Sequence, residues 1–171
     1  MVLLTTLALA HFAGLKPPAT LTIPDNSLPF RRGTDAKGKN VFPGQILQWN
    51  YWDRALDSGE LSMNPQGFGS MPSNQPFHPT KAFTLKARIR LEKDAAGRIF
   101  DKVSPGKRDG LFLEVQPGRR LRLVVGSFTL SSNPVLTLGK EHTVAAVFGA
   151  QESDAFLVVD GQIVALYRTG R

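Results

Sequence analysis

The stretch "AFTLKARIRLE", residues 82–92, alternates apolar and polar side chains over almost its whole length. Alternation with a period of two places every second side chain on the same face of an extended chain. The apolar face holds Phe83, Leu85, Ala87, Ile89 and Leu91. The polar face holds Thr84, Lys86, Arg88 and Arg90. The pattern predicts a strand with one face in a protein core and the other toward solvent.

Similar segments fill most of the chain after this strand. They are separated by Gly and Pro residues and read RIFDKV (98–103), GLFLEVQ (110–116), RLRLVVG (120–126), SFTLSS (127–132), HTVAAVFG (142–149) and AFLVVDGQIVALYR (155–168). In the last segment Asp160 and Gly161 lie between two apolar runs, which predicts a two-residue hairpin because both residues tolerate a positive φ. Short strands at regular spacing, without helical segments between them, indicate an all-β sandwich.

Two motifs in this half of the chain resemble those of a known family. Residues 141–145, EHTVA, stand where the concanavalin A-like, laminin G-like jelly-roll family has a Trp-His-His-Val-Ala type motif, although the Trp is missing. Residues 158–161, VVDG, stand where that family has a Tyr-(Val/Ile)-Asp-Gly hairpin, although the Tyr is missing. The motifs and strands occur in the family's usual order over about half of the chain. The resemblance implies a concanavalin A-like jelly-roll sandwich of two antiparallel sheets.

The stretch "FPGQILQWNYWDRALDSGEL", residues 42–61, resembles the closing strand of the same family, yet it precedes the opening strand. Three explanations are open: a circularly permuted jelly roll, the tail of one module joined to the head of another, or a coincidence of loose patterns. Two half-modules would leave open sheet edges, so we favour one permuted or strand-complemented sandwich. We therefore expect residues 42–54 to form a strand in the same sandwich as residues 83–91. On that strand Ile46, Trp49 and Tyr51 should face the core near Leu85 or Ile89.

The length and composition fit one domain covering residues 1–171. A chain of this size buries roughly 70% of the surface that its unfolded form exposes. We expect a closing-strand part at 1–61, a Pro- and Gly-rich connecting loop at 62–81 and an opening-strand part at 82–171. The chain has no Cys, so disulfides, thiolate nucleophiles and Cys-bound metals are excluded. The apolar start "MVLLTTLALAHFAG" lacks the preceding basic residue of a secretory signal, and no apolar run is long enough for a membrane span.

The formal charge of +7 favours a polyanionic partner. Nucleic acid is disfavoured, because the sequence has no basic helix, zinc-finger spacing or strand with paired aromatics. An anionic polysaccharide or other glycan remains, bound by side chains predicted to point outward from the strands. The candidate ligand-binding residues are Lys86, Arg88, Arg90, Arg120, Arg122 and Trp52. An ordinary solvated sheet face explains the same basic residues about equally well, and Trp52 can instead be packed as an aromatic residue usually is at this position of the family.

Catalysis and metal binding find less support. Some glycoside hydrolases of this fold use two nearby carboxylates, which a strand would carry at i, i+2 or i, i+4. Glu152 and Asp154 fall in a predicted hairpin loop, and Glu114 stands alone in its segment. The three histidines, His11, His78 and His142, have no recognisable Ser or Asp spacing. Leu47 replaces the Asp of the family's closing strand, and we expect no metal or other cofactor at the single acids Asp101 and Asp109.

These patterns together predict a non-catalytic, lectin-like carbohydrate-binding module, with a purely structural domain-joining module and a glycoside hydrolase as the alternatives. The resemblance further implies an extracellular or cell-surface location and other domains of a larger protein as partners. We also expect that no two carboxylates lie about 5 Å apart on one concave face, the distance that a retaining glycosidase requires.

Overall fold

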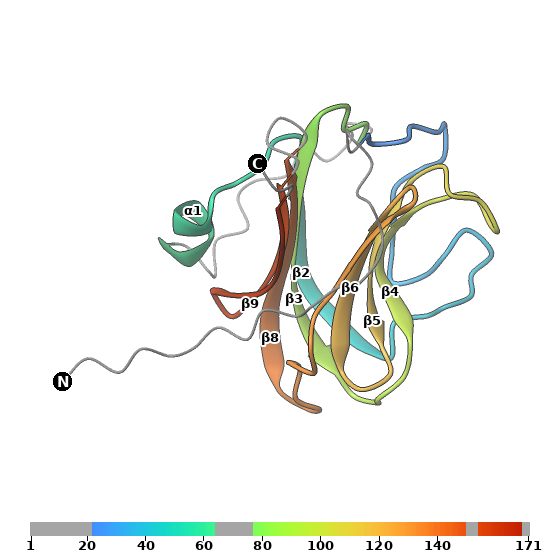
Figure 1. Ribbon diagram of the computed structural model, residues 1–171. Helices are drawn as coiled ribbons and strands as arrows, with labels where there is room; N and C mark the ends of the chain where they lie inside the picture. Colours follow the sequence, from blue (N-terminus) through green and yellow to red (C-terminus); the bar gives the residue numbers. More distant parts are fainter. Residues whose placement is uncertain (1–21, 64–76, 150–153, 169–171) are drawn as a thin grey trace, which may run out of the picture.

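Two antiparallel five-stranded sheets form the molecule (Figure 1). The computed structural model describes residues 22–63, 77–149 and 154–168. Sheet A has the order β1 (Arg31–Arg32), β4 (Gly97–Lys102), β5 (Leu111–Gln116), β6 (Arg120–Val125) and β7 (Phe128–Ser131). Sheet B has the order β10 (Gln162–Tyr167), β9 (Asp154–Val159), β8 (Glu141–Gly149), β3 (Ala82–Leu91) and β2 (Gly44–Trp52). The predicted all-β sandwich and each strand predicted after residue 82 are confirmed.

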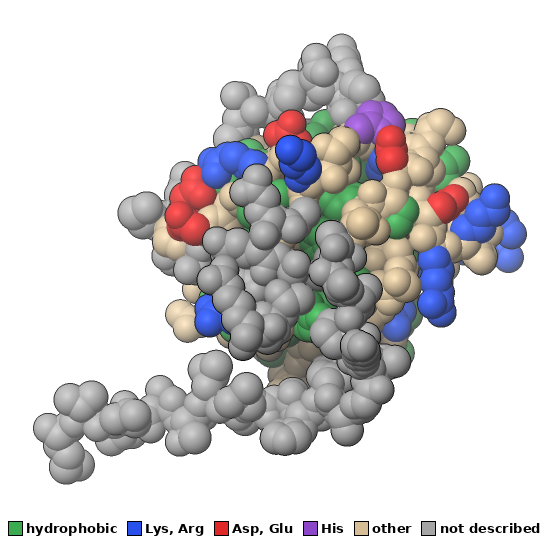
Figure 2. All heavy atoms as spheres, turned by 45° about the horizontal axis from the view of Figure 1, so that its top comes forward, with side chains coloured by type: hydrophobic (Ala, Val, Ile, Leu, Met, Phe, Trp, Pro, Cys, Tyr) green, Lys and Arg blue, Asp and Glu red, His purple; other side chains and the backbone are tan. Residues whose placement is uncertain are grey.

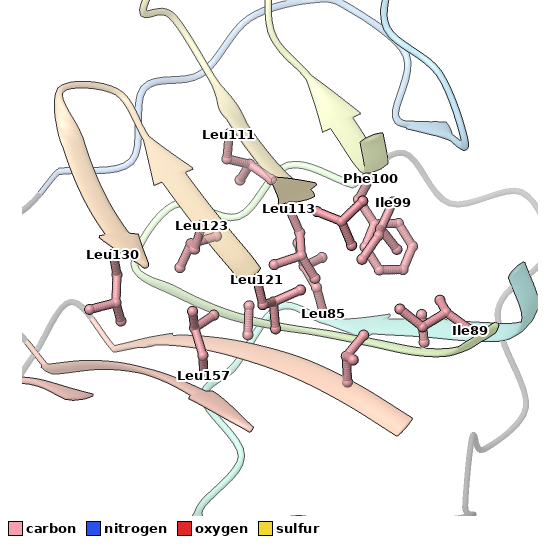
Figure 3. Close-up of a cluster of buried hydrophobic side chains, with 14 of the residues drawn as sticks. Leu85, Ile89, Ile99, Phe100, Leu111, Leu113, Leu121, Leu123, Leu130 and Leu157 are labelled. Carbon is pink, nitrogen blue, oxygen red and sulfur yellow. The ribbon is translucent and has the colours of Figure 1, made fainter. Parts of the chain in front are cut away.

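One hydrophobic core fills the space between the two sheets. Figure 3 shows Leu85 and Ile89 from β3 and Leu157 from β9 opposite the leucines of sheet A. All five apolar residues predicted for one face of β3 are at most 1% exposed. A fully buried Leu, Ile or Phe side chain contributes roughly 1.5–3 kcal/mol, so this face of β3 contributes strongly to stability.

The closing-strand segment lies beside the opening strand, as predicted. β2 pairs antiparallel with β3, and Ile46 lies opposite Ile89, Trp49 opposite Ala87 and Tyr51 opposite Leu85. All three β2 side chains pack against the main core, which contains residues from Phe42 to Val159. Both parts of the chain therefore share one core, and an arrangement as two separate half-modules is wrong.

A β-bulge in β2 explains how these side chains share a face. Ile46 and Trp49 are three residues apart, so strict alternation would place them on opposite faces. The register shifts between Ile46 and Gln48, and the additional residue, Leu47, is 37% exposed. The extra residue restores the alternation, and such bulges are common at sheet edges.

The segment after β2 covers part of the outer face of sheet B and contains the helix α1 (Ser58–Met63), which the sequence did not predict. Asp57 and Glu60 cap its first turn reciprocally: the Glu60 N–H donates to Asp57 Oδ1 at 2.7 Å, and the Asp57 N–H donates to Glu60 Oε2 at 2.9 Å. Leu56 and Leu61 pack with Val147 in a second, smaller hydrophobic cluster. A helix of six residues is too short to be stable alone, so this packing maintains it.

Thr84 ties the same segment to β3. Its hydroxyl accepts the Leu56 N–H at 2.9 Å and donates to the Arg54 carbonyl at 2.9 Å, and the side chain is fully buried. Thr84 lies on the polar face of β3 predicted to be exposed. That part of the prediction is wrong, because residues 53–61 cover this end of the strand.

The two family-like motifs meet at a buried histidine. His142 Nδ1 lies 2.7 Å from Asp160 Oδ2, and His142 Nε2 accepts the Thr137 N–H at 3.0 Å. Since Nε2 accepts a hydrogen bond, the proton belongs on Nδ1, from which it is donated to Asp160. Asp160 also accepts the Thr143 N–H and has a φ of 50°, and Gly161 has a φ of 79°. The Asp-Gly hairpin is confirmed, and its carboxylate joins the turn to β8.

The segment before β1 is held against sheet A by Asn26 and Lys102. The Asn26 amide donates to the carbonyls of Lys102 and Asp109, at 3.1 and 2.6 Å. The ammonium of the buried Lys102 donates in return to the carbonyls of Asn26 and Leu28, at 2.6 and 2.9 Å. Burial lowers the Lys102 pKa. These contacts bring β1 into position beside β4.

Three predictions concern residues that the description does not cover. The apolar start, most of the connecting loop and Glu152 lie outside the described residues, as does the side chain of Asp154. Within the described part of the chain, no helix combines the length and the apolarity that a membrane crossing needs.

Candidate functional site

The six predicted ligand-binding residues lie on opposite outer faces of the sandwich. Trp52, Lys86, Arg88 and Arg90 are on sheet B, whereas Arg120 and Arg122 are on sheet A. On β3 and β6 the intervening apolar residues face the core and are almost fully buried. Arg88 and Arg90 therefore do not form one basic surface with Arg120 and Arg122.

On sheet B, the basic residues are buried or accompanied by acids. Lys86 is 3% exposed, and burial lowers its pKa, so the ammonium is not presented to solvent. Arg88 Nε lies 3.9 Å from Glu141 Oε2, and Arg90 Nη2 lies 3.7 Å from Glu92 Oε1. Cross-strand pairing places Glu141 directly opposite Arg90. The positive charge of this face is largely balanced.

Trp52 packs against the second hydrophobic cluster, beside Leu56 and Leu61. The packed arrangement considered for this residue is therefore the observed one. Its ring is partly covered by residues 53–61 and offers less surface for a sugar than a fully exposed indole would.

On sheet A, Glu114 lies at the centre of a cluster of arginines. Its Oε1 accepts a hydrogen bond from Arg122 Nε at 2.7 Å and also pairs with Arg122 Nη2. Its Oε2 lies 2.7 Å from Arg98 Nη1, and Gln116 Nε2 donates to Oε1. The carboxylate is only 4% exposed. Glu114, which stands alone in its sequence segment, is thus surrounded by charged and polar partners from β4, β5 and β6.

Asp101 extends this cluster to β1. Arg31 donates to Asp101 Oδ2 from Nε at 3.1 Å and from Nη2 at 2.8 Å, and Arg98 Nε lies 3.6 Å from Oδ1. Asp101 is fully buried, and this burial raises its pKa even though two arginines lie nearby. Burial likewise lowers the pKa of Arg98. Desolvation therefore opposes both ion pairs, as expected for charges held away from water.

Arg98 also lies 3.3 Å above the ring centre of Phe112, in a cation–π contact. Its side chain contacts both acids: Nε lies near Asp101 and Nη1 lies near Glu114. The meeting of these two acids at one arginine was missed from the sequence. Finding it requires the register of β4 and β5, in which Arg98 lies opposite Glu114.

Beside this cluster lies a polar pocket of about 290 Å³. Its floor is a cross-strand row, in which Phe112 pairs with Val124 and Val124 pairs with Thr129. Arg122 lies two residues before Val124, on the same face of β6. Lys107 and Arg108 line the pocket from the exposed β4–β5 loop. Three basic residues, one from β6 and two from the β4–β5 loop, therefore line the same pocket as the Thr129 hydroxyl and the apolar side chains of Phe112 and Val124.

A second, larger pocket of about 570 Å³ lies on the outer face of sheet B. Its lining is more apolar and includes Ile163 and Leu166, which are 45% and 42% exposed. Its charged lining residues are mixed: Arg54, Lys81 and Arg168 with Asp53 and Asp57. Arg54 is moreover paired with Glu60 at 2.8 Å. This pocket does not favour an anion in the way that the pocket at Arg122 does.

The acids considered for metal binding have protein partners instead. Asp101 is bound to Arg31, and Asp109 Oδ1 accepts the Ser104 N–H at 2.8 Å. Among the described residues, no group of three or more His, Asp or Glu side chains is arranged to hold a metal ion.

Comparison of the chain with protein-family models, with curated protein sequences and with solved structures gave no match.

Proposed function

We propose that this chain is a non-catalytic carbohydrate-binding module for an anionic polysaccharide, and that the pocket at Arg122 binds the acidic groups. The observation that carries the proposal is that Arg122, Lys107 and Arg108 line one polar pocket. Arginine and lysine bind carboxylate and sulfate groups through charge-assisted hydrogen bonds. Val124 and the part of Phe112 that Arg98 leaves uncovered add apolar surface that suits the C–H face of a sugar ring.

The charge of the surrounding face supports the same proposal. Arg31, Arg98 and Arg122 extend from the strands of sheet A, and the acids that contact them are Asp101 and Glu114. Lys107 and Arg108 add exposed positive charge at one end of the face. Figure 2, in which the top of Figure 1 comes forward, shows several Lys and Arg side chains together on the right, with Asp or Glu side chains beside them.

A concanavalin A-like jelly roll with permuted strand order is part of the proposal. It is supported by the pairing of β2 with β3 and by the contact between the two family-like motifs at His142 and Asp160. An extracellular or cell-surface role as an accessory module of a larger protein follows from that resemblance alone. The hydrolase alternative is set aside because Asp101 and Glu114 are both paired with arginines, which leaves neither acid free to act on a substrate.

The test compares two double variants that remove the same charge from opposite faces. Wild-type protein, K107S/R108S and R88S/R90S are titrated with polygalacturonate, dextran sulfate and neutral dextran. We expect wild type and R88S/R90S to bind one of the two polyanions, and K107S/R108S to bind it about three- to tenfold more weakly, because each exposed ion pair contributes roughly 0–1 kcal/mol. Binding should weaken as added salt shortens the Debye length below its physiological value of about 8 Å.

Two results would contradict the proposal. If neither polyanion binds in a salt-sensitive way, the basic residues of sheet A form an ordinary solvated surface. The alternative of a purely structural, domain-joining module is then favoured. If R88S/R90S loses affinity while K107S/R108S retains it, the binding surface lies on sheet B instead.

A further inference from the structure

We infer that Glu114 is a positioning residue that orients the Arg122 guanidinium, so that the pocket selects an oxyanion group matching its fork and not merely negative charge. The inference rests on the proposed function. The ligand group that Arg122 binds is then a carboxylate or a sulfate, each of which presents two oxygens to a guanidinium.

An acid in the middle of an anion-binding face needs an explanation. Glu114 lowers the positive charge of the face and would repel an anionic ligand if charge alone mattered. It is nevertheless almost fully buried, and it points away from the core on the same side of the sheet as Arg122, which lies directly opposite on β6. The Glu114 carboxylate therefore interacts with neighbouring side chains and hardly with solvent.

The contacts of Glu114 fix one edge of the Arg122 guanidinium. Nε and Nη2 of Arg122 both bond to Oε1 of Glu114. A guanidinium has five N–H groups in a plane, so the edge formed by Nη1 and Nη2 retains N–H groups outside this pair. Arg122 lines the pocket and its side chain is 34% exposed, so it is accessible there to a ligand.

Glu114 is itself held from several sides. Arg98 lies 2.7 Å from Oε2, and it is fixed in turn by its stacking on Phe112 and its contact with Asp101. Gln116 donates to Oε1 from the same strand. A carboxylate held in this way restricts the rotamers of Arg122, and less side-chain entropy is lost when a ligand binds.

The decisive variants are E114Q and R122K, with R120K as the matched control. E114Q raises the net charge by one, so simple electrostatic attraction would tighten polyanion binding. If Glu114 positions Arg122, E114Q should instead weaken binding about five- to tenfold, the net contribution of one ordinary hydrogen bond, because the amide oxygen of Gln holds the guanidinium less firmly than a carboxylate. R122K keeps the charge but loses the planar fork and should weaken binding similarly, whereas R120K, on the same strand at an exposed position, should change it less than twofold.

Each variant is titrated with polygalacturonate and with dextran sulfate, and thermal unfolding confirms that it is folded. The polymer that shows the larger R122K effect identifies the group as carboxylate or sulfate. Unchanged or tighter binding by folded E114Q would overturn the inference. If E114Q does not fold, equal effects of R122K and R120K would overturn it. Absence of binding by the wild type would instead reject the proposed function, and this inference with it.

Discussion

At the scale of single residues, His142 shows how a buried polar side chain can specify a turn. It satisfies the Thr137 N–H with one ring nitrogen and reaches Asp160 with the other, and it is only 4% exposed. Unsatisfied buried donors are costly, so the ring must be present and correctly oriented. The histidine thus links the loop before β8 to the turn between β9 and β10.

We predict that H142A lowers the free energy of unfolding by about 2 kcal/mol, because it leaves the Thr137 N–H without its acceptor and Asp160 without a partner ring. Urea unfolding followed by fluorescence measures the change. H78A is the matched control: His78 lies 3.1 Å from Asp25, and both side chains are largely exposed, so little change is expected. Equal effects of the two substitutions would show that the buried contacts of His142 contribute nothing.

At the scale of elements, the segment 53–63 depends on sheet B for its structure. Its short helix has a capping box, but its stability comes from Leu56 and Leu61 against Val147, and from the two hydrogen bonds of Thr84. This segment bounds the larger pocket and covers part of Trp52. Its attachment therefore controls how much of that face meets solvent.

We predict that T84V loosens this segment while the sandwich remains folded. Valine has nearly the shape of threonine, but it cannot accept a hydrogen bond from the Leu56 N–H or donate one to the Arg54 carbonyl. Amide hydrogen exchange at Leu56 and Leu61 should accelerate about tenfold, with exchange in β8 little changed. T84S, which retains the hydroxyl, should exchange much more slowly than T84V. Similar exchange in all three proteins would mean that apolar packing alone holds the segment.

At the scale of the whole molecule, the two parts of the chain complete each other. Without β2, the apolar face of β3 would lose Trp49 and Tyr51 from the edge of the core. Without β1 and the residues before it, Asp101 would lose Arg31, and Lys102 would lose its carbonyl acceptors. Neither part retains a closed core alone.

We predict that fragments 1–63 and 77–171 are each unfolded in isolation and assemble when mixed. Circular dichroism should show the β signal only in the mixture, and size-exclusion chromatography should show a one-to-one complex. A matched mixture in which the first fragment carries Trp49→Asp should not assemble, because a charge would enter the core. Cooperative unfolding of fragment 77–171 alone would contradict the prediction.

Period-two patterns were enough to predict the strands and the core face of β3, since burial of alternate side chains is a local property of a strand. The place of β2 beside β3 followed from its misplaced motif. The charged cluster could not be predicted, because Asp101 and Glu114 lie on different strands and meet only through Arg98. The burial of Lys86 and Thr84 could not be predicted either. Alternation shows on which face of the sheet a side chain lies, but not which other segments of the chain cover that face.

The strand order has a consequence for synthesis on the ribosome. Translation proceeds from the N-terminus, so β1 and β2 emerge before any strand with which they pair. Arg31 meets Asp101, seventy positions later, and β2 meets β3 only after residues 53–81 have been made. The nascent β2, GQILQWNYW, carries no charged side chain. During translation this uncharged strand therefore lacks its native neighbour until β3 has been made, and its unpaired edge can meanwhile pair with other chains.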